Sequence, residues 1–509
     1  MDASPIFAEQ PQLAAKRSAN PLLIALAVTA LVTVLRLLDT VDVDVAWQLW
    51  IAGRLNAGTH LYRDIIEVNP PLWFWMAQPI DAVARLLGAR PESTMVAAMG
   101  ALSALSLAAT NRLLPDLPRA RRSLLLGYSA LALMAMPWVH VGQREQIALI
   151  GSLPYAALVA SRAERKDVPH GLAILIGIGA ALGFSLKHYF LIVPAALELW
   201  LIVRLRRDWR AFRPETIGIV AVGTLYALAI LIFAPDFLTR MLPLIRLSYG
   251  IFGAPSFSQV LGLFALLGLG LLAFVGAHWR LLTKAPFASA LTVAAAGFAA
   301  VYFVQSKGWL YHAIPLVGCA SIALAALLAE IPDAPRMLRL LSPALLVLPL
   351  LFAAQEQLHP AEPSPELVNS VAGLRPGDTV GFLAVDNALP WSVTLQRGFR
   401  YPSRYMSFWM LNAIVTNERS GNPNPALARF GRTVVSDTVE DFRCLPPKAI
   451  IVARPGPGER GLDIRAFFLR DPKFGELFSH YKARPWAGFQ RYDLASPLPT
   501  PQSACRPGI

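Results

Sequence analysis

Two aspartates that stand close together near the start of the chain, Asp42 and Asp44, have the chemistry of a general base. They occur in the stretch LLDTVDVDVAWQLW, where a carboxylate could accept a proton from a hydroxyl group held within hydrogen-bond distance. The apolar stripe that follows predicts a helix, so both carboxylates could instead cap its N-terminus and stabilise its dipole. Capping is the better explanation for Asp39, whereas both roles remain open for the pair.

A second polar stretch, LYRDIIEVNPPLWFW, holds charged and amide side chains directly before two prolines and an aromatic run. In a soluble loop these residues would form an ordinary turn. Between a helix that lies on a surface and a bulky aromatic segment, they could instead line a binding site for a polar substrate. The candidate substrate-binding residues of this stretch are Arg63, Asp64, Glu67 and Asn69.

The stretch WVHVGQREQIAL places three polar residues, Gln143, Arg144 and Glu145, between two apolar segments. Ionisable side chains so close to apolar helices are costly, and they often line a site or a water-filled cavity. Partners elsewhere in the chain would also satisfy them. Gln143 and Arg144 are therefore further candidates for substrate binding.

Two later stretches, SLKHYF and SKGWLYH, combine lysine with histidine and tyrosine. Lysine offers a point charge, while tyrosine and histidine offer directed donors, so the two stretches together would make a clamp for a phosphate group. The lysines could equally extend from helix ends toward water. The residues of this predicted clamp are Lys187, His188, Lys307, Tyr311 and His312.

The elements that must position these residues are membrane helices. Of the 509 residues 55% are apolar, and the mean hydropathy of +0.48 exceeds what a soluble core needs. Apolar windows of about 17 to 22 residues recur from Pro21 to Leu351, each long enough to cross a bilayer as a helix. The net charge of +13 could suggest nucleic acid, but the basic residues cluster between the windows, as cytoplasmic loops do. We therefore predict a polytopic membrane protein in contact with membrane lipids, and we exclude nucleic acid as a partner.

The basic clusters predict which side of the membrane each loop occupies. They lie at 112–122, 162–166, 204–213, 280–284 and 336–339, and a pair of windows separates each cluster from the next. The stretch 72–87 contains Asp81 and Arg85, so it is predicted to be a re-entrant or surface-lying helix. This scheme gives about eleven crossings. They are 21–38, 93–111, 123–138, 146–160, 170–186, 188–203, 216–234, 257–277, 286–304, 312–329 and 338–355.

The same scheme divides the chain into parts and gathers its polar stretches on one side. The predicted parts are a cytoplasmic tail at 1–20, a transmembrane domain at 21–355 with its first outer loop at 39–71, a Pro-rich linker at 356–370 and an outer domain at 371–509. The loops expected to converge on the outer face are 39–71, 140–145, 187–189, 235–256 and 305–312. The candidate residues named above would therefore share one site.

The tail after Pro360 loses the long apolar windows, and we predict that it forms a small mixed α/β domain. Its strand candidates are DTVGFLAV, KAIIVAR and FQRYDL, and helices are expected around 404–416 and 463–474. Cys444 and Cys505 could pair if this domain lies in an oxidising compartment. Several side chains could contact a glycan or, equally, pack the domain onto the membrane part; they are Trp391, Arg397, Arg400, Arg404 and Trp409.

Taken in order, the five polar stretches resemble the outer loops of the GT-C superfamily, in particular the protein O-mannosyltransferase and aminoarabinose transferase group. By motif order the resemblance covers about the first 330 residues, which implies the GT-C fold for that part. These integral-membrane glycosyltransferases use a polyprenyl-phosphate sugar as donor. The resemblance therefore implies a hexosyl- or pentosyltransferase of the bacterial inner membrane, with its active site and its outer domain facing the periplasm. The acceptor would be a lipid-linked or cell-envelope glycan such as lipopolysaccharide.

The resemblance also implies roles for particular residues. An acidic residue of the first outer loop is the general base of this family, which matches Asp44, with Asp42 as the close second, and the second acidic position falls near Glu145. The sequence EVNPP stands where the family has Glu-x-Lys-Pro-Pro, so Asn69 replaces a lysine, and a lysine of the predicted clamp would supply the positive charge. Metal dependence varies across the superfamily, so a divalent metal is a possible cofactor, and we assign no metal ligands.

Two other functions compete with this interpretation. A transporter or flippase of lipid-linked sugars would need alternating access, and the sequence has no convincing internal repeat of the kind such proteins use. A membrane-anchored scaffold, with passive loops and a tail that binds partners, is a further alternative. The sequence also lacks a Gly-rich phosphate loop, a paired CxxC and an HExxH motif, so nucleotide-driven transport and zinc hydrolysis have no support.

Overall fold

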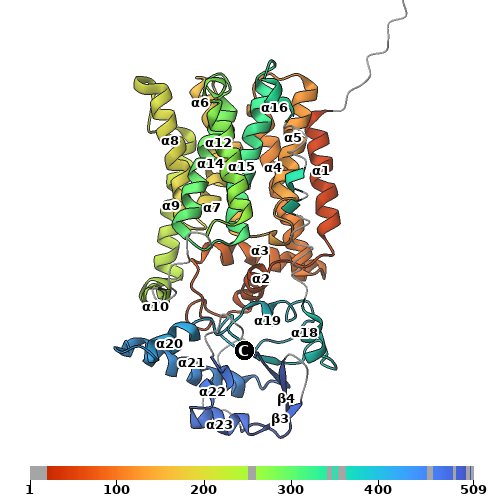
Figure 1. Cartoon of the computed structure of the whole chain (residues 1–509), viewed down its shortest axis with the longest axis vertical. Coiled ribbons are helices and arrows are strands. Elements are labelled where there is room, and N and C mark those ends of the chain that lie inside the picture. The colour runs from red at the N-terminus through yellow and green to blue at the C-terminus, as the bar shows by residue number, and fades with distance from the viewer. Residues whose placement is uncertain are drawn as a thin grey trace, which may run out of the picture.

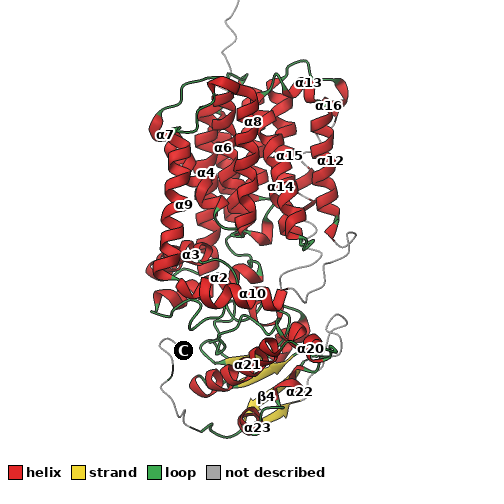
Figure 2. Ribbon diagram, turned by 90° about the vertical axis from the view of Figure 1, so that its left-hand side faces the viewer, coloured by secondary structure: helices red, strands yellow, loops and turns green. Residues whose placement is uncertain are grey.

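The computed structural model consists of a bundle of long helices and, below it in Figures 1 and 2, a smaller domain built on a β-sheet. It describes residues 20–249, 260–340, 347–349, 351–352, 363–454, 462–484, 489–499 and Cys505. The predicted cytoplasmic tail at 1–20 therefore lies outside the described residues except for Asn20, as do residues 356–362 of the predicted linker at 356–370.

A long helix coincides with every predicted membrane crossing except the last, 338–355, most of which lies outside the described residues. Five described helical segments, Pro91–Leu113, His188–Asp208, Pro214–Phe233, Pro286–Gln305 and Leu310–Glu330, are long and apolar enough to cross a membrane. The chain thus has a polytopic helical fold, and the number of about eleven crossings stays a prediction. The bundle helices are α1 (Pro21–Arg36), α4 (Pro91–Leu113), α5 (Arg119–Met134), α6 (Arg144–Ala163), α7 (His170–Phe184), α8 (Ile192–Leu205), α9 (Pro214–Phe233), α12 (Leu263–Ala277), α14 (Pro286–Gln305) and α15 (Leu310–Glu330).

The two ends of the bundle carry different kinds of residue. Successive helices alternate in direction, so the basic clusters gather at the end marked by the short helices α13 (Trp279–Leu282) and α16 (Arg336–Leu340) in Figure 2. The helices α2 (Val43–Asn56), α3 (Leu72–Leu87) and α10 (Leu242–Tyr249) lie at the opposite end, next to the sheet domain. There α3 lies beside α2 instead of running through the bundle, which agrees with the surface-lying helix predicted for 72–87.

Close backbone packing fixes α6, whose N-terminus begins at the polar stretch GQREQ. A Cβ atom on Gly183 of α7 would lie 3.1 Å from the carbonyl oxygen of Ile147 in α6, and one on Gly177 would lie 2.4 Å from that of Glu215 in α9. Glycine at these positions lets the three helices approach closely. Near the basic end, Arg162 of α6 also donates to the Glu215 carboxylate at 3.0 Å. Contacts near both ends of α6 therefore fix its position in the bundle.

The domain after residue 363 contains a four-stranded sheet in the order β1-β2-β4-β3. The strands β1 (Val380–Leu383) and β2 (Ala449–Val452) are parallel, and β4 (Gln490–Leu494) pairs antiparallel with β2 and with β3 (Tyr481–Arg484). The three strand candidates coincide with β1, β2 and β4, whereas β3 was not predicted. The helices of this domain are α18 (Pro365–Ser370), α19 (Ala388–Trp391), α20 (Leu411–Glu418), α21 (Pro425–Cys444), α22 (Ile464–Phe468) and α23 (Pro472–Phe478).

The helix predicted for 404–416 begins only at Leu411, because the residues before it make other contacts. The backbone N–H of Ile66, in the first outer loop, donates to the carbonyl oxygen of Arg404 at 2.8 Å, and Ile66 forms an isolated parallel bridge with Tyr405. The segment 404–405 therefore takes an extended form that ties the two parts of the chain together.

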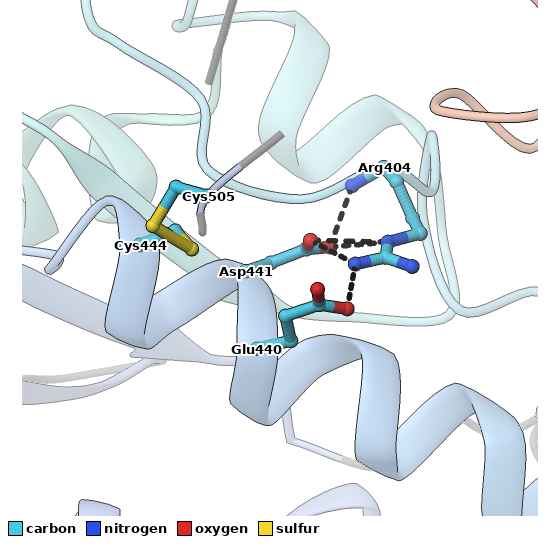
Figure 3. The surroundings of a disulfide bond; sticks show 5 residues. All are labelled: Arg404, Glu440, Asp441, Cys444 and Cys505. Carbon is cyan, nitrogen blue, oxygen red and sulfur yellow. Dashed lines mark hydrogen bonds and ion pairs between the residues drawn. A yellow bond between two sulfur atoms is a disulfide. The ribbon is translucent and has the colours of Figure 1, made fainter. Parts of the chain in front are cut away.

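The side chain of Arg404 is buried in an ion-pair cluster with one face of α21 (Figure 3). Its guanidinium donates to Asp441 at 2.6 Å and to Glu440 at 2.7 Å. Burial raises the pKa of Asp441 to about 6 even though the hydrogen bonds from Arg404 favour the ionised form. Because the cluster is buried, this arginine is a structural residue rather than the glycan contact that the sequence allowed.

We expect Arg404→Ala to lower the free energy of unfolding of the C-terminal domain by about 3–5 kcal/mol, because it leaves the Asp441 carboxylate buried without its partner. Pulse proteolysis of the purified protein across a denaturant series would measure this loss. The matched variant Arg470→Ala removes an exposed pair with Glu418 and should cost about 1 kcal/mol or less. Equal stabilities for the two variants would contradict a structural role for the buried cluster.

Candidate functional site

Asp42 and Asp44 take different roles at the start of α2. Asp42 is the N-cap residue, and its Oδ1 accepts a hydrogen bond from the backbone N–H of Asp44 at 2.8 Å. Its other partners are His140 Nδ1, 2.9 Å from Oδ2, and Gln143 Nε2, which donates to Oδ1 at 2.9 Å. The capping role therefore belongs to Asp42, whereas Asp39, for which capping was predicted, pairs with Arg36 instead.

The carboxylate of Asp44 lines a cavity and receives neutral donors from three separate elements. Asn387 Nδ2 donates to Oδ1 at 3.1 Å, while the hydroxyl of Tyr311 and Nε2 of Gln143 lie 3.3 and 3.4 Å from Oδ2. No ion pair with a cation within 4 Å holds this carboxylate among the described residues. It is thus oriented without being neutralised.

The pKa values of the two aspartates are shifted in opposite directions. Burial and the charge of Asp42 raise the pKa of Asp44 to about 6. Burial acts in the same direction on Asp42, but His140, through its hydrogen bond and charge, outweighs it together with the hydrogen bonds from the Asp44 backbone and Gln143, so the pKa of Asp42 is lowered. A carboxyl whose pKa lies near the working pH is suited to accept a proton and release it again, which favours Asp44 over Asp42 as the base.

A chain of hydrogen bonds from the first outer loop holds Arg144 in place. Glu67 accepts from the indole N–H of Trp47 at 2.5 Å and from the backbone and side-chain N–H groups of Asn69 at 2.7 Å each. The Asn69 side-chain oxygen in turn accepts a hydrogen bond from Arg144. The guanidinium also lies 4.5 Å from the centre of the Trp73 ring. Glu67 and Asn69 thus position a cation.

Lys187 and Glu145 form a buried ion pair. Lys187 Nζ donates to Glu145 Oε1 at 2.5 Å and to Gln305 Oε1 at 2.8 Å, and it lies 3.2 Å from His312 Nε2. An ammonium group has three donors, and these partners occupy all of them. Burial, partly offset by Glu145, lowers the pKa of Lys187 to about 8. The phosphate contact predicted for Lys187 would require one partner to be displaced.

Several buried polar atoms beside this pair have no hydrogen-bond partner among the described residues. They are Gln143 Oε1, Arg144 Nε, Glu145 Oε2 and His312 Nδ1. Because lysine only donates, His312 accepts at Nε2, so a neutral ring carries its hydrogen on the unpartnered Nδ1. Unpaired polar groups cost free energy in a buried place, which is characteristic of a site that awaits a ligand or water.

Two adjoining cavities meet at this cluster. The first, about 290 Å³, contains Asp44, and the C-terminal domain forms one of its walls with Asn387, Ser407 and Trp409. The second, about 330 Å³, is lined by His188, Lys187 and His312 on one side and by apolar residues of 237–245 on the other. The residues common to both are Val68, Asn69, Arg144, Lys307 and Trp309. Two cations therefore stand between a carboxylate cavity and a cavity with an apolar wall.

The structure brings most of the predicted site residues together, but not all of them. Arg63 and Asp64 line neither cavity; Asp64 accepts from the backbone N–H of His60 at 2.9 Å, and the Arg63 side chain is 53% exposed. Tyr311 contacts Asp44 instead of lining the second cavity, where a phosphate clamp was predicted. Gln143 supports both aspartates and lines neither cavity.

Sequence reasoning missed the contribution of the C-terminal domain to the carboxylate cavity. Asn387 and Ser407 both line it, and neither was a candidate. Asn387 is the second residue after the strand candidate DTVGFLAV, and the carboxyl ends of parallel strands are where open α/β sheets bind ligands. The position of Asn387 after a predicted strand is therefore the sequence feature from which its place in the site could have been predicted. Trp409, named as a possible glycan contact, also lines the cavity, whereas Trp391 packs against Trp47 of α2 with ring centres 4.8 Å apart.

Within the described part of the chain, no group of three or more histidine, cysteine, aspartate or glutamate residues could hold a metal ion.

The comparisons with known proteins identify the fold. No family model matches the chain, and no curated protein matches its sequence. The crystal structure of ArnT from Cupriavidus metallidurans bound to undecaprenyl phosphate is similar over 94% of this chain and 99% of that chain, with a TM-score of 0.54 and 13% identity. The oligosaccharyltransferase AglB from Archaeoglobus fulgidus, in complex with an inhibitory peptide and a dolichol-phosphate, is similar over 93% of this chain and 74% of that chain, with a TM-score of 0.43 and 12% identity. The likeness to ArnT shows the fold, and the predicted GT-C resemblance is confirmed at that level.

Proposed function

We propose that the chain is a membrane glycosyltransferase that moves a sugar from a polyprenyl-phosphate donor to a hydroxyl group of a lipid-linked or cell-envelope glycan. One observation carries this proposal. Arg144 and Lys307 lie on the wall shared by two cavities, with Asp44 in one cavity and an apolar wall in the other. The arrangement offers a base, cations for a phosphate and an apolar surface for a hydrocarbon chain in two adjoining cavities with a shared wall.

The second cavity has the chemistry needed for the donor. Its apolar residues Phe237, Leu242 and Ile245 would contact the first prenyl units, and Arg144 and Lys307 would contact the phosphate. A planar guanidinium held by Asn69 and Trp73 is well suited to bind phosphate oxygens through two parallel hydrogen bonds. ArnT, which has the same fold, is described bound to undecaprenyl phosphate, which supports this class of donor.

The first cavity has the chemistry needed for the acceptor. Asp44 would take the proton from an acceptor hydroxyl as its oxygen bonds to the anomeric carbon of the donor sugar. The bond from that carbon to the phosphate oxygen breaks at the same time, and the polyprenyl phosphate leaves with its electrons. Arg144 would stabilise the negative charge that develops on the phosphate. Trp309 and Trp409 line this cavity and would pack against sugar rings.

We further propose that the protein resides in the bacterial inner membrane with its site toward the periplasm. Two observations support this orientation. The basic clusters lie at the bundle end away from the site, as cytoplasmic loops would. In addition, Cys444 at the end of α21 is joined to Cys505 by a disulfide (Figure 3), and disulfides persist in oxidising compartments such as the periplasm.

A transfer assay tests the proposal. Purified protein in lipid nanodiscs would receive polyprenyl phosphates carrying radiolabelled hexoses or pentoses, together with envelope glycolipids from a strain that lacks this chain. Appearance of label in the glycolipid is the expected result. In a parallel experiment with the protein reconstituted in sealed vesicles, movement of the labelled donor across the bilayer, with no transfer to any acceptor, would instead support the flippase alternative and overturn the proposal.

The rate of transfer should depend on pH through Asp44. Because burial raises the pKa of this carboxyl to about 6, it binds a proton below that pH and can no longer act as a base. We therefore expect kcat/KM to be constant well above pH 6 and to fall about tenfold for each pH unit below it. Initial rates measured between pH 4.5 and 8 would check this. A midpoint near the ordinary aspartate value, roughly pH 4, would contradict the assignment of the base.

A further inference from the structure

Asn387 connects the C-terminal domain directly to the carboxylate of Asp44. Among the described residues, its side-chain Nδ2 is the donor that reaches Oδ1, at 3.1 Å, whereas the other two donors lie beside Oδ2. The two residues are 343 positions apart in the chain, so the contact depends entirely on how the domain docks. Both side chains line the carboxylate cavity, which places the hydrogen bond inside the site.

Aromatic contacts hold the segment that carries Asn387 against α2. Directly after it, Trp391 of α19 packs against Trp47 and Trp50, with ring centres 4.8 and 5.6 Å away. The indole N–H of Trp391 also donates to the carbonyl oxygen of Met406 at 2.7 Å. Because α2 carries Asp44 in its first turn, these contacts hold donor and acceptor in a fixed relation. The hydrogen bond is therefore a built feature of the interface rather than a chance approach of two mobile side chains.

From this geometry we infer that Asn387 is a positioning residue which the C-terminal domain supplies to Asp44, orienting its carboxylate and favouring its ionised form. This inference rests on the proposed function, in which Asp44 is the base. An amide N–H donates best to a negatively charged oxygen, so the contact favours loss of the proton. It also fixes the torsion of the carboxylate, which sets the direction of the lone pair that meets the acceptor hydroxyl.

Other charged or titratable groups also act on Asp44, and the effect of Asn387 must be distinguished from theirs. The first outer loop contributes two carboxylates that disfavour its ionised form, α6 and the turn before α8 contribute cations that favour it, and α15 contributes a phenol. These groups are Asp42, Glu67, Arg144, Lys187 and Tyr311, and two further charged residues, Lys307 and Asp386, line the same cavity. None of them is altered by a substitution at position 387, so a change seen there reports the amide itself.

The test compares the ionisation of Asp44 in the full-length protein and in Asn387→Ala. Loss of one hydrogen bond to the charged form should move the midpoint of the kcat/KM profile upward by about half a pH unit to one unit. The same shift should occur in the pH dependence of carbodiimide labelling of Asp44, followed by peptide mass spectrometry, which reports the protonated carboxyl without requiring turnover. We expect kcat to fall while KM for the donor stays the same, because the donor cavity does not contain Asn387.

Asn387→Asp gives the sharper result. It keeps the size of the side chain but places a second carboxylate against Asp44, so it should raise the labelling midpoint further than alanine does. If Asn387 served only in packing, the labelling midpoint would not be higher in Asn387→Asp than in Asn387→Ala. The matched control is Asn369→Ala, an exposed asparagine of the same domain, which should leave both midpoints unchanged.

An unchanged labelling midpoint in both variants would overturn the inference. If the alanine variant does not fold, the labelling midpoint of Asn387→Asp alone tests it. The labelling readout also separates this failure from failure of the proposed function. A protein without any transfer activity, but with the expected shift in labelling, would remove the enzyme assignment and leave the link between Asn387 and Asp44 intact.

Discussion

Asp44→Asn should lower kcat/KM for sugar transfer by about 10²–10⁴-fold, the contribution of a positioned general base. The amide has nearly the same size as the carboxylate, so Asn387, Tyr311 and Gln143 keep a neighbour of similar shape. It cannot accept the acceptor's proton, however. Donor binding should not change, because Asp44 does not line the cavity assigned to the donor. Single-turnover rates with saturating donor, together with a binding titration of the donor, would measure both quantities.

Two neighbouring aspartates provide the comparison. Asp39→Asn changes a residue that pairs with Arg36 and lines neither cavity, so transfer should proceed at the normal rate. Asp42→Asn should cause a smaller loss than Asp44→Asn, because it weakens the helix cap and the contact with His140 without removing the base. Full activity in both Asp44→Asn and Asp42→Asn would exclude carboxylate-assisted transfer at this site.

The second large effect is expected at Arg144. We expect Arg144→Lys to lower the rate of transfer by about 10²–10³-fold, although it keeps the positive charge. Lysine cannot offer a planar pair of donors to a phosphate. It would also lose the hydrogen bond to Asn69 and the contact with the Trp73 ring that hold the guanidinium at the wall between the cavities. The measurement is kcat with the donor saturating, accompanied by the affinity for polyprenyl phosphate alone.

Arg165→Lys is the matched control, since Arg165 pairs with Asp208 at the opposite end of the bundle and is 69% exposed. It should leave both quantities unchanged. If Arg144→Lys transfers sugar at the normal rate and binds polyprenyl phosphate normally, the phosphate lies elsewhere. The other cation of the shared wall, Lys307, would then be the first alternative to test.

The arrangement of the membrane part could be predicted from sequence because it follows from hydrophobicity and charge. Windows of apolar residues locate the helices, and the arginine clusters assign their ends, so the stretches at 140–145 and 305–312 were expected on one face. The structure brings them together there: Lys187 joins Glu145 of the first to Gln305 at the start of the second. The choice of Asp44 as the base came from its position after the first helix and from the family resemblance.

Other features could not be predicted because they depend on tertiary contacts that leave no local pattern. Lys187 was expected to bind a phosphate, yet its three donors are occupied by Glu145 of the stretch 140–145 and by Gln305 and His312 of the stretch 305–312. No sequence pattern near Asn387 predicts a contact with Asp44. The long helix α21 was missed for a simpler reason. It is apolar along one face only, through residues such as Leu427, Val434 and Phe442, so no apolar window reveals it.

The hydrogen bond between Asn387 and Asp44 also determines when the site becomes complete during synthesis. The two partners are 343 residues apart, and ribosomes add about 5–20 residues per second, so roughly 20 to 70 seconds separate their translation. During that interval the membrane helices can insert while the carboxylate still lacks its third donor and its cavity lacks one wall. A nascent or prematurely terminated chain would therefore have an incomplete cavity around Asp44. In the proposed orientation, the last third of the polypeptide would have to cross the membrane and fold before the first outer loop reaches its final form.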